Sequence, residues 1–308
     1  MKAIRVSEFG KPDVLKMQEI ERPKTKADEV LIKVAFAAVL PIDTKIRQGK
    51  VMKKKFPYTP GIAVSGTIVE VGTAVSGFEV GDPVFGRTKG GAYQEFARIP
   101  QSQLNHKPKL LTFAKAAAII AGAETAWKAL FTQGKLQSGE RVLIQGAAGG
   151  VGHIAVQLAK WKEAEVIGTA SSKNQDFLRE LGVDQAIDYQ TESFETAMIE
   201  KADLVVDLIG GKVQERSLHV LKQGGRLVSL VENAASEEAK AMGIDLIYSQ
   251  ESPTLEDLDK LAELMAAGIV KTVIESVYDF TEEQVQAATM KCETGHGQGR
   301  ILLRIAED

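Results

Sequence analysis

Short apolar runs, broken at intervals by glycine and proline, fill the first 110 residues of the chain. The runs are rich in β-branched residues and alternate with turn signals such as Gly81-Asp82-Pro83 and Gly90-Gly91. This combination is typical of short antiparallel strands and predicts a mainly β domain. The predicted strands cover residues 3–6, 29–37, 65–71, 83–85 and 92–98.

From residue 112 onward, helical runs alternate with short apolar strands. Alanine-rich helices are predicted at residues 113–120 and 124–133. Strands that are apolar along their whole length and are separated by helices form parallel sheets, so this part predicts a doubly wound α/β domain. Its predicted strands are residues 142–145, 166–169, 185–188, 204–207 and 226–230, with 246–248 as a candidate sixth, and its predicted helices are 151–161, 174–181, 194–201 and 213–221.

The end of the chain returns to strand patterns after a predicted helix at residues 254–267. Strands predicted at 273–278 and 300–305 are expected to complete the first domain. The chain as a whole is therefore predicted to belong to the α/β class. One domain is expected to comprise residues 1–121 completed by 269–308, and the other residues 122–268.

A glycine-rich turn joins the predicted strand at 142–145 to the helix that follows. Because glycine lacks a Cβ atom, the backbone turns sharply, approaches a ligand closely and presents its N–H groups beside the positive end of the helix. Followed by a second strand at βαβ distance, such a turn predicts a dinucleotide pyrophosphate site, although glycine turns also serve purely structural purposes. The expected cofactor-binding residues of the turn are Gly146, Ala148, Gly149, Gly150, Val151 and Gly152.

The residues after the second strand of this unit favour NADP(H) over NAD(H). In such folds an acidic side chain at this position binds the ribose 2′-hydroxyl of NAD, but the chain has no carboxylate here before Asp176. Ser171, Ser172 and Lys173 instead offer hydroxyl donors and a cation to a 2′-phosphate, and no anion is expected to oppose it. NADPH is therefore the predicted cofactor. Ser171 is also well placed to cap the following helix, and the two roles are compatible.

Composition and charge argue against several kinds of partner and site. A formal net charge of −3 disfavours nucleic acid and anionic membranes, and no apolar run is long enough to span a bilayer. A predicted strand at the very start leaves no room for a signal peptide, so a cytoplasmic location is expected. The single cysteine, Cys292, excludes an internal disulfide and a thiolate zinc cluster. The histidines, which lack ligand spacing, are His106, His153, His219 and His296.

Short motifs follow one another in a consistent order along nearly the whole chain. They are Pro60-Gly61, Thr125-Ala126-Trp127 and the segments 66–72, 81–85, 91–96, 147–152, 186–189 and 297–302. In this order and spacing they resemble the zinc-independent quinone oxidoreductase branch of the medium-chain dehydrogenase/reductase superfamily. The resemblance implies a GroES-like, mainly β domain plus a doubly wound, parallel-sheet Rossmann domain. It also implies a homodimer joined edge to edge, for which residues 246–248 are the candidate edge.

The positions of the zinc ligands are apolar in this chain. Zinc-dependent relatives place a Cys near the start of the pattern that here begins at Leu40, and a His-Glu pair at Ile62-Ala63. Apolar side chains do not coordinate Zn²⁺, so no metal site is expected and a Lewis-acid route to alcohol oxidation is closed. Quinone reductases themselves commonly carry an Asn at Leu40, an acidic residue at Ala63 and a Tyr near Val51, so the predicted pocket is less polar than theirs.

The resemblance also implies site residues outside the glycine turn. It places the nicotinamide near Leu40, Thr125 and the turn, and Asp43 in the same cleft. Thr125 either offers its hydroxyl to the carboxamide or the substrate or bonds to its own helix, and Asp43 either orients a neighbour or makes a structural hydrogen bond. Tyr189 is implied beside the adenosine end, with a core aromatic as the alternative. Along the ribose and nicotinamide path the resemblance implies Gly211, Leu230, Val231 and Tyr248.

These inferences predict a zinc-independent, NADPH-dependent oxidoreductase that transfers hydride to a quinone or a related electrophilic carbonyl acceptor. The protein need only place the nicotinamide C4 against the acceptor, exclude water and stabilise the oxyanion. Two alternatives stay open: an NADPH-dependent reductase of the C=C bond in enones or enals, and an NADPH-binding module with little turnover. The expected partner is a small-molecule electrophile, with no nucleic acid and no membrane.

Overall fold

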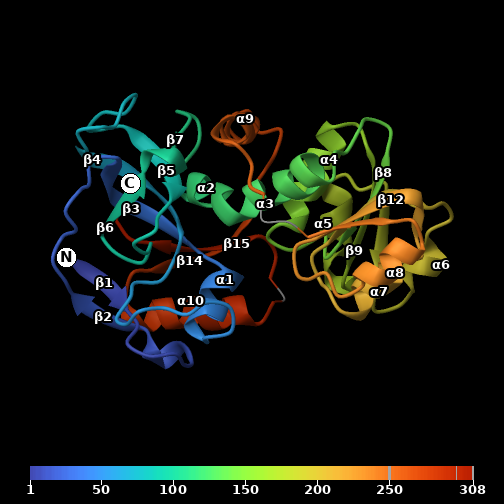
Figure 1. The fold of residues 1–308 in the computed structure, drawn as a ribbon, viewed down its shortest axis with the longest axis horizontal. Helices are drawn as coiled ribbons and strands as arrows, with labels where there is room; N and C mark the ends of the chain where they lie inside the picture. Colours follow the sequence, from blue (N-terminus) through green and yellow to red (C-terminus); the bar gives the residue numbers. More distant parts are fainter. Residues whose placement is uncertain (249–250, 296, 307–308) are drawn as a thin grey trace. The chain divides into compact units, whose positions relative to one another are not determined.

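The computed structural model describes residues 1–248, 251–295 and 297–306. Contacts within the chain divide it into two compact units (Figure 1). His296, one of the four scattered histidines, lies outside the described residues. The first unit comprises Met1–Ala121, Leu255–Ala267 and Thr272–Asp308, and the second comprises Gly122–Thr254 and Gly268–Lys271.

A mainly antiparallel seven-stranded sheet forms the framework of the first unit, with the order β14-β15-β3-β4-β5-β7 and β6 paired to β3. The longest strand, β3 (Glu29–Val39), pairs with β4 along one edge, while β6 and β15 share its other edge. Strand β15 comes from the end of the chain, so the tail completes the sheet that the N-terminal part begins. The other strands are β4 (Ala63–Val71), β5 (Pro83–Arg87), β6 (Phe96–Pro100), β7 (Leu104–His106), β14 (Ile274–Asp279), β15 (Arg300–Arg304) and a separate pair, β1 (Lys2–Arg5) and β2 (Lys16–Glu19).

Only the second half of the predicted strand at 92–98 is part of the sheet. Gly91 has φ +98°, and a Cβ atom there would lie 2.4 Å from the carbonyl oxygen of Thr59, so the chain makes a tight turn at this point. The residues that follow run beside β1, where Ile4 N–H donates to Tyr93 O (2.9 Å), before β6 begins at Phe96.

The described residues of the first unit form four helices. Helix α10 lies beside α1, although the two are far apart in the sequence (Figure 1), and it also packs on β14, β15 and β3. Its inward residue Val285 joins a core formed with strand residues such as Ile32, Val64 and Leu303. The helices are α1 (Pro41–Arg47), α2 (Phe113–Ala117), α9 (Leu255–Ala266) and α10 (Glu282–Glu293), with short turns η1 (Pro12–Val14) and η2 (Gln101–Gln103).

Helix α9 groups with the first unit, whereas the expected boundary at residue 268 placed it in the second. It packs against β7, and Asn105 Nδ2 donates to Asp259 Oδ1 (2.9 Å) and to Leu255 O (3.1 Å). The sequence pattern of a helix does not reveal which distant strand it contacts, and here that contact decides the grouping.

The second unit contains a six-stranded, fully parallel sheet in the order β10-β9-β8-β11-β12-β13. This order reverses between β8 and β11, as in doubly wound nucleotide-binding folds, and confirms the predicted Rossmann sheet. Its core includes Leu143, Ile167, Val205 and Leu227. The strands are β8 (Arg141–Gln145), β9 (Glu165–Ala170), β10 (Gln185–Asp188), β11 (Ala202–Asp207), β12 (Leu221–Ser229) and β13 (Asp245–Ile247).

Helices connect these strands in sequence. Helices α4 and α5 contact β8 to β10, and α7 and α8 contact β11 to β13. Because parallel crossovers are right-handed, the two pairs cover opposite faces of the sheet. The helices are α3 (Glu124–Trp127), α4 (Gly152–Trp161), α5 (Gln175–Glu180), α6 (Phe194–Ala197), α7 (Lys212–Leu218) and α8 (Ser236–Ala241), with the π-helix η4 (Lys128–Gln133) and the 3₁₀ turn η5 (Ser172–Asn174). A further π-helical segment, η3 (Ile119–Ala123), contains Ala121, the residue at which the first range of the first unit ends.

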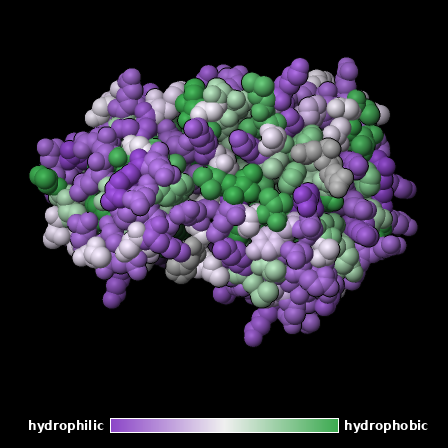
Figure 2. Space-filling model, turned by 180° about the vertical axis from the view of Figure 1, so that it is seen from behind, coloured by the Kyte–Doolittle hydropathy of each residue, from purple (hydrophilic) through white to green (hydrophobic). Residues whose placement is uncertain are grey.

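Hydrophilic side chains prevail on the face of the molecule that Figure 2 shows. This agrees with a charged fraction of 26% and with surface ion pairs such as Lys16 with Glu282 (2.9 Å). In the part of the chain that the structure describes, no helix combines the length and the apolar character needed to cross a bilayer.

Candidate functional site

The glycine turn lies between β8 and α4, at the carboxyl edge of the parallel sheet. Gly146 has φ +73°, a left-handed value that other residues rarely adopt. A Cβ atom on Gly152 would lie 2.3 Å from the carbonyl oxygen of Gly146, so the turn closes only with glycine there. Strand β9 holds the turn in place, because Gly146 N–H donates to Thr169 Oγ1 (3.1 Å) and Ala147 N–H donates to Thr169 O (2.9 Å).

Several backbone N–H groups of this turn have no acceptor among the residues that the structure describes. Gly149 N–H is satisfied within the turn, since it donates to Gly146 O (3.1 Å). Unbonded amides at the start of the ten-residue helix α4 are suited to an anion, because their partial charges add to that of the helix end. The unbonded groups belong to Ala148, Gly150, Val151 and Gly152.

His153 supports the turn from inside the unit. Its side chain is fully buried, its Nδ1 lies 2.8 Å from Gly149 O, and its ring packs near that of Phe177 with centroids 6.4 Å apart. This histidine is therefore a packing residue rather than a metal ligand.

Asp207 holds the loop on the other side of the point where the strand order reverses. It ends β11 and is fully buried; its Oδ1 accepts the N–H groups of Ile209 and Gly210, both at 2.9 Å. Its Oδ2 accepts Ser229 Oγ–H (2.9 Å) and Gln214 Nε2–H (3.1 Å). From the sequence, Asp207 is predicted only as the last residue of a strand. An Asp placed shortly before two glycines was the available signal of a tightly bonded loop.

The residues implied along the ribose path lie in loops after β11, β12 and β13. Gly211 has φ +56°, and its N–H donates to Glu232 Oε1 (2.5 Å). Leu230 N–H donates to Asp207 O (3.0 Å). Because the carboxyl ends of parallel strands share one edge, these loops lie at the same edge of the sheet as the glycine turn. Val231 and Tyr248, which follow β12 and β13, are both exposed.

The segment expected to bind a 2′-phosphate follows β9 directly. Ser171 precedes the short turn η5, and its side chain makes no capping hydrogen bond, so the capping role considered for it is not filled. Lys173 is exposed on the same turn. Ser172 differs from the expectation, because its Oγ–H donates to Asp188 Oδ2 (2.5 Å) and its N–H donates to Gln190 Oε1 (3.0 Å).

The expectation that no anion stands near this segment was wrong. Asp188 ends β10, where it pairs with Ala170, the last residue of β9. The Ser172 hydroxyl holds the pKa of Asp188 below its usual value, with the Gln190 N–H acting in the same direction, so the carboxylate is charged at neutral pH. The sequence does not indicate the contact between Ser172 and Asp188, because the two residues are 16 positions apart and only the pairing of β9 with β10 brings them together.

Tyr189 follows β10 and is 55% exposed, which excludes the alternative of a core aromatic. Its N–H donates to Ala170 O (3.2 Å), so its backbone is attached to the end of β9. An exposed ring next to the Ser171 segment is available for stacking against a nucleotide base.

In the first unit, Leu40 and Asp43 lie at the start of α1. Leu40 is almost completely buried. Asp43 Oδ2 accepts Leu40 N–H (3.2 Å) and Tyr93 Oη–H (3.3 Å), which is the structural hydrogen-bonding role considered for this residue. Burial raises the pKa of Asp43 to about 7, although these two hydrogen bonds and the charges of Arg300 and Arg87 act in the opposite direction.

A buried cluster around Asp43 was not found by sequence reasoning. Arg300 is 6% exposed, and its Nε and Nη2 have no hydrogen-bond partner in the described part of the chain. Burial lowers the pKa of Arg300 to about 10 and raises that of Cys292 to about 11. The thiol is therefore protonated at neutral pH. These residues come from three separate elements, α1, α10 and β15, so no local motif indicates that they meet.

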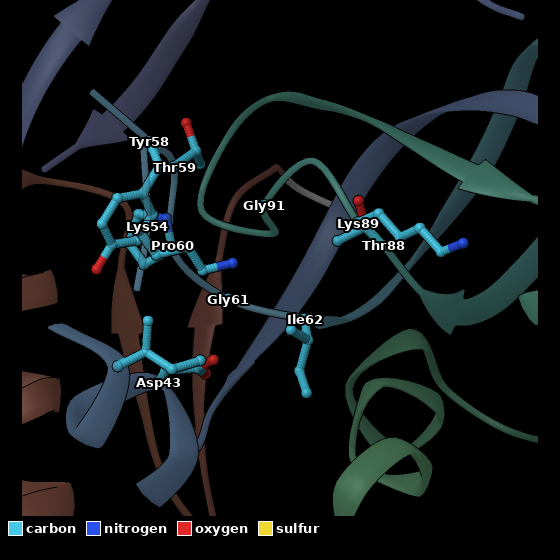
Figure 3. A pocket seen from close by; sticks show the side chains of 11 residues that line it. Asp43, Lys54, Tyr58, Thr59, Pro60, Gly61, Ile62, Thr88, Lys89 and Gly91 are labelled. Atoms are coloured by element: carbon cyan, nitrogen blue, oxygen red, sulfur yellow. The ribbon is translucent and has the colours of Figure 1, made fainter. Parts of the chain in front are cut away.

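A small hollow in the first unit is open beside Asp43 (Figure 3). Tyr58, Gly61 and Ile62 line it together with Asp43. Lys54 also lines it, and its Nζ lies 5.7 Å from the centre of the Tyr58 ring. The lining of the hollow therefore combines an ionisable carboxyl, a phenol, two lysine side chains and two threonine hydroxyls with apolar residues such as Ile62.

The side chains at the positions of the zinc ligands are apolar, and of these Ile62 is half-buried. Ala63 is fully buried and Leu40 is 1% exposed. No group of three His, Cys, Asp or Glu side chains placed to hold a metal ion occurs within residues 1–248, 251–295 and 297–306. In the second unit, Thr125 is half-buried on α3, and its hydroxyl makes no hydrogen bond to any residue that the structure describes, so the backbone-bonded alternative is not observed.

Two family models match the chain. The model for the alcohol dehydrogenase GroES-like domain matches residues 26–109, and the model described as zinc-binding dehydrogenase matches residues 181–303. The first match lies in the antiparallel unit, and the second includes most of the parallel sheet.

Individual relatives match over nearly the full chain. Quinone oxidoreductase from Rattus norvegicus is 33% identical over 98% of this chain and 97% of its own length. The chloroplastic NADPH-dependent alkenal/one oxidoreductase of Arabidopsis thaliana is 34% identical over 98% of this chain and 79% of its own.

Solved structures agree with these relatives. Quinone oxidoreductase from Coxiella burnetii has a TM-score of 0.94 and 33% identity, with 99% of both chains covered. Escherichia coli quinone oxidoreductase complexed with NADPH has a TM-score of 0.91 and 26% identity, with 99% of this chain and 100% of that chain covered. The chain belongs to the zinc-independent quinone oxidoreductase branch of the medium-chain dehydrogenase/reductase superfamily.

Proposed function

We propose that the chain is an NADPH-dependent reductase that transfers hydride to a quinone or a related electrophilic carbonyl compound without a metal. The anion site of the glycine turn carries this proposal. Four N–H groups without an acceptor in the described chain, at the reversal point of a Rossmann sheet, fit the pyrophosphate of a dinucleotide. The similar Escherichia coli structure is a complex with NADPH, and the Arabidopsis relative is named as NADPH-dependent, which supports NADPH as the dinucleotide.

Within the second unit, each part of the cofactor has candidate residues. We assign the pyrophosphate to the unbonded amides of the turn and the 2′-phosphate to Ser171 and Lys173. Tyr189 is assigned to the adenosine end because its exposed ring lies next to that segment. The loops after β11 to β13 are assigned to the ribose and nicotinamide; their residues are Gly211, Leu230, Val231 and Tyr248.

Roles toward the acceptor are proposed for Leu40 and Asp43 of the first unit and for Thr125 of the second. When NADPH is bound, its nicotinamide supplies the hydride, so the protein need only exclude water and stabilise charge on the acceptor oxygen. The buried, apolar Leu40 serves the first purpose. The Thr125 hydroxyl, which has no partner among the described residues, is a donor for the second.

Reduction of the C=C bond of an enone or enal is the second candidate reaction. It is favoured by two relatives at 34% identity, the Arabidopsis alkenal/one oxidoreductase and the 2-methylene-furan-3-one reductase of Solanum lycopersicum. Both reactions deliver hydride to a conjugated electrophile. The same cofactor site therefore serves either one.

Steady-state rates with a quinone and with an enone distinguish the candidates. The purified chain is mixed with NADPH and either 1,4-benzoquinone or 3-penten-2-one, and the loss of NADPH absorbance is followed with and without EDTA. We expect turnover of the quinone that EDTA leaves unchanged. Faster turnover of the enone, with a saturated ketone as product, would select the second candidate. Tight NADPH binding without turnover of either compound would instead indicate a binding module.

Replacing Lys173 tests the assignment of the 2′-phosphate. Loss of a charge-assisted hydrogen bond costs roughly 1.5–3 kcal/mol, so Lys173→Ala is expected to raise the Kd for NADPH at least about tenfold and to change that for NADH much less. Isothermal titration calorimetry measures both. Lys201→Ala, at the amino end of β11, removes an equal charge from the opposite edge of the sheet and serves as control. Equal weakening of NADPH and NADH would contradict the assignment.

We further infer that the chain forms a homodimer through the edge of the parallel sheet. Strand β13 is the last strand of that sheet in the described chain, and it has a hydrogen-bonded neighbour on one side, β12. An unpaired edge is a template for a second strand, so two copies can join their sheets there.

A further inference from the structure

Asp188 and Ser172 connect the two loops at the proposed adenosine end of the site. The Ser172 hydroxyl donates to Asp188 Oδ2 (2.5 Å), and Asp188 Oδ1 accepts Gln190 N–H (3.0 Å). Ser172 N–H donates to Gln190 Oε1 (3.0 Å). Both hydrogen-bond donors of Ser172 are therefore used within the protein.

The chemistry of the ribose 2′ substituent determines what this arrangement can bind. A phosphate dianion only accepts hydrogen bonds, whereas a hydroxyl both donates and accepts. Because the Ser172 proton is directed at Asp188, the Ser172 oxygen presents lone pairs to a ligand. Lone pairs suit the 2′-hydroxyl of NADH and give no support to the 2′-phosphate of NADPH.

The charge of Asp188 acts in the same direction. The groups that face its carboxylate are the Ser172 hydroxyl, the Gln190 N–H and the Thr191 side chain, all of them neutral. No charged side chain is among the groups that shift the pKa of Asp188 in the described part of the chain. The Asp188 carboxylate would therefore repel a 2′-phosphate beside Ser171, whereas it would not repel an uncharged 2′-hydroxyl.

We propose that Asp188 is a specificity-determining residue that restrains the preference for NADPH, so that the site binds NADH as well. The inference rests on the proposed function, because it requires the adenosine end of the nucleotide to lie at the ends of β9 and β10. Lys173 attracts the 2′-phosphate, Asp188 repels it, and the balance sets the ratio of the two affinities.

Asp188→Asn tests the proposal by binding alone. The Asn side chain retains an acceptor for Gln190 N–H, removes the charge and frees the Ser172 proton. Kd values for NADPH and NADH are measured by isothermal titration calorimetry at low ionic strength, without an acceptor. We expect the ratio of the Kd for NADH to that for NADPH to rise about fivefold, from removal of one like charge. Ser172→Ala, which leaves the charge of Asp188 in place, should change the ratio less than about twofold.

Asp176→Asn is the matched control. Asp176 is an exposed acidic residue on the following helix and is paired with Arg179 (2.5 Å). An equal rise in the ratio for Asp176→Asn and Asp188→Asn would overturn the proposal, because the effect would then be one of net charge. An unchanged ratio in Asp188→Asn, with both nucleotides still bound, would overturn it as well. Absence of binding of either nucleotide to the wild-type chain would instead overturn the proposed function.

Discussion

Gly152 is the residue where the backbone of the glycine turn leaves no space for a side chain. A Cβ atom at residue 152 would lie 2.3 Å from Gly146 O. Neither atom can move without the backbone, so the turn must open in Gly152→Ala. We expect a loss of about 1–3 kcal/mol in unfolding free energy and a large loss of NADPH affinity. Urea denaturation and titration calorimetry measure the two effects.

Gly149→Ala is the control for this change. A Cβ atom on Gly149 would lie 3.4 Å from Gly146 O, an ordinary contact, so its unfolding free energy should change by less than about 0.5 kcal/mol. If Gly152→Ala were as stable as Gly149→Ala, the steric account of the turn would be refuted.

Asp43 makes stability depend on pH. Burial raises its pKa from 3.8 to about 7, so the folded chain keeps a proton that the unfolded chain releases between these values. Stability is therefore expected to fall as pH rises from about 4 to about 7, by an amount on the order of 4 kcal/mol from this group, and to level off above. Tyr93 and Leu40, which bond to the carboxylate, reduce the loss without reversing it.

Asp43→Asn isolates this contribution. The variant has no titrating group at position 43, so it should lack the loss of stability that Asp43 causes in the wild type. The unfolding free energy of the variant minus that of the wild type should therefore increase as pH rises from 5 to 8. Urea denaturation of both proteins at these two pH values gives the difference. A difference that stayed constant would show that Asp43 titrates alike in the folded and unfolded chains.

At the scale of elements, Asp207 ties the end of β11 to its neighbours. Its two oxygens accept four hydrogen bonds from the loop before α7, from α7 itself and from β12. Asp207→Asn replaces one acceptor by a donor that faces existing donors, so a loss of about 1–3 kcal/mol is expected. Urea denaturation measures it, with Asp176→Asn as a surface control that should change little; equal stability of the two variants would contradict this role.

The strands of the parallel sheet could be predicted because they are buried on both faces and apolar throughout. Strand β10, for example, has the predicted bounds, and β8, β9 and β11 extend beyond theirs by one or two residues. Strand β2 (Lys16–Glu19) was missed, because its residues are mostly exposed and no apolar alternation marks them. Helix α10 was missed for a similar reason, since its buried residues Val285, Ala288 and Thr289 form only a narrow stripe.

The candidate site shows the same division between local and non-local information. The glycine turn is formed by consecutive residues, so it could be predicted from the sequence. The Asp188 carboxylate reaches Ser172 only because β10 lies beside β9. The cluster of Asp43, Cys292 and Arg300 is likewise assembled from separate elements. Strand order and packing are properties of the folded chain, and no spacing in the sequence encodes them directly.

At the scale of the whole molecule, the residues assigned to the cofactor's phosphates all belong to one of the two units, and the other unit has its own hydrophobic core. The glycine turn, Ser171 and Lys173 all belong to the second unit, whose core includes Leu143 and Val205. The first unit has a core of its own, to which Val285 belongs. Ligand binding and core packing can therefore be perturbed separately.

Linkage between NADPH binding and stability tests this separation. A ligand that binds only the folded chain stabilises it by about 2.7 kcal/mol at a free concentration of 100 Kd, so NADPH should raise the Tm of the wild type. Val285→Ala, which removes buried methyl groups from the first core, should lower the Tm through lost packing yet keep the NADPH-induced rise. Gly152→Ala should lose that rise, because its defect lies in the anion site itself. Scanning calorimetry with and without NADPH measures all three proteins, and a full NADPH-induced rise in Gly152→Ala would show that the nucleotide does not depend on the turn.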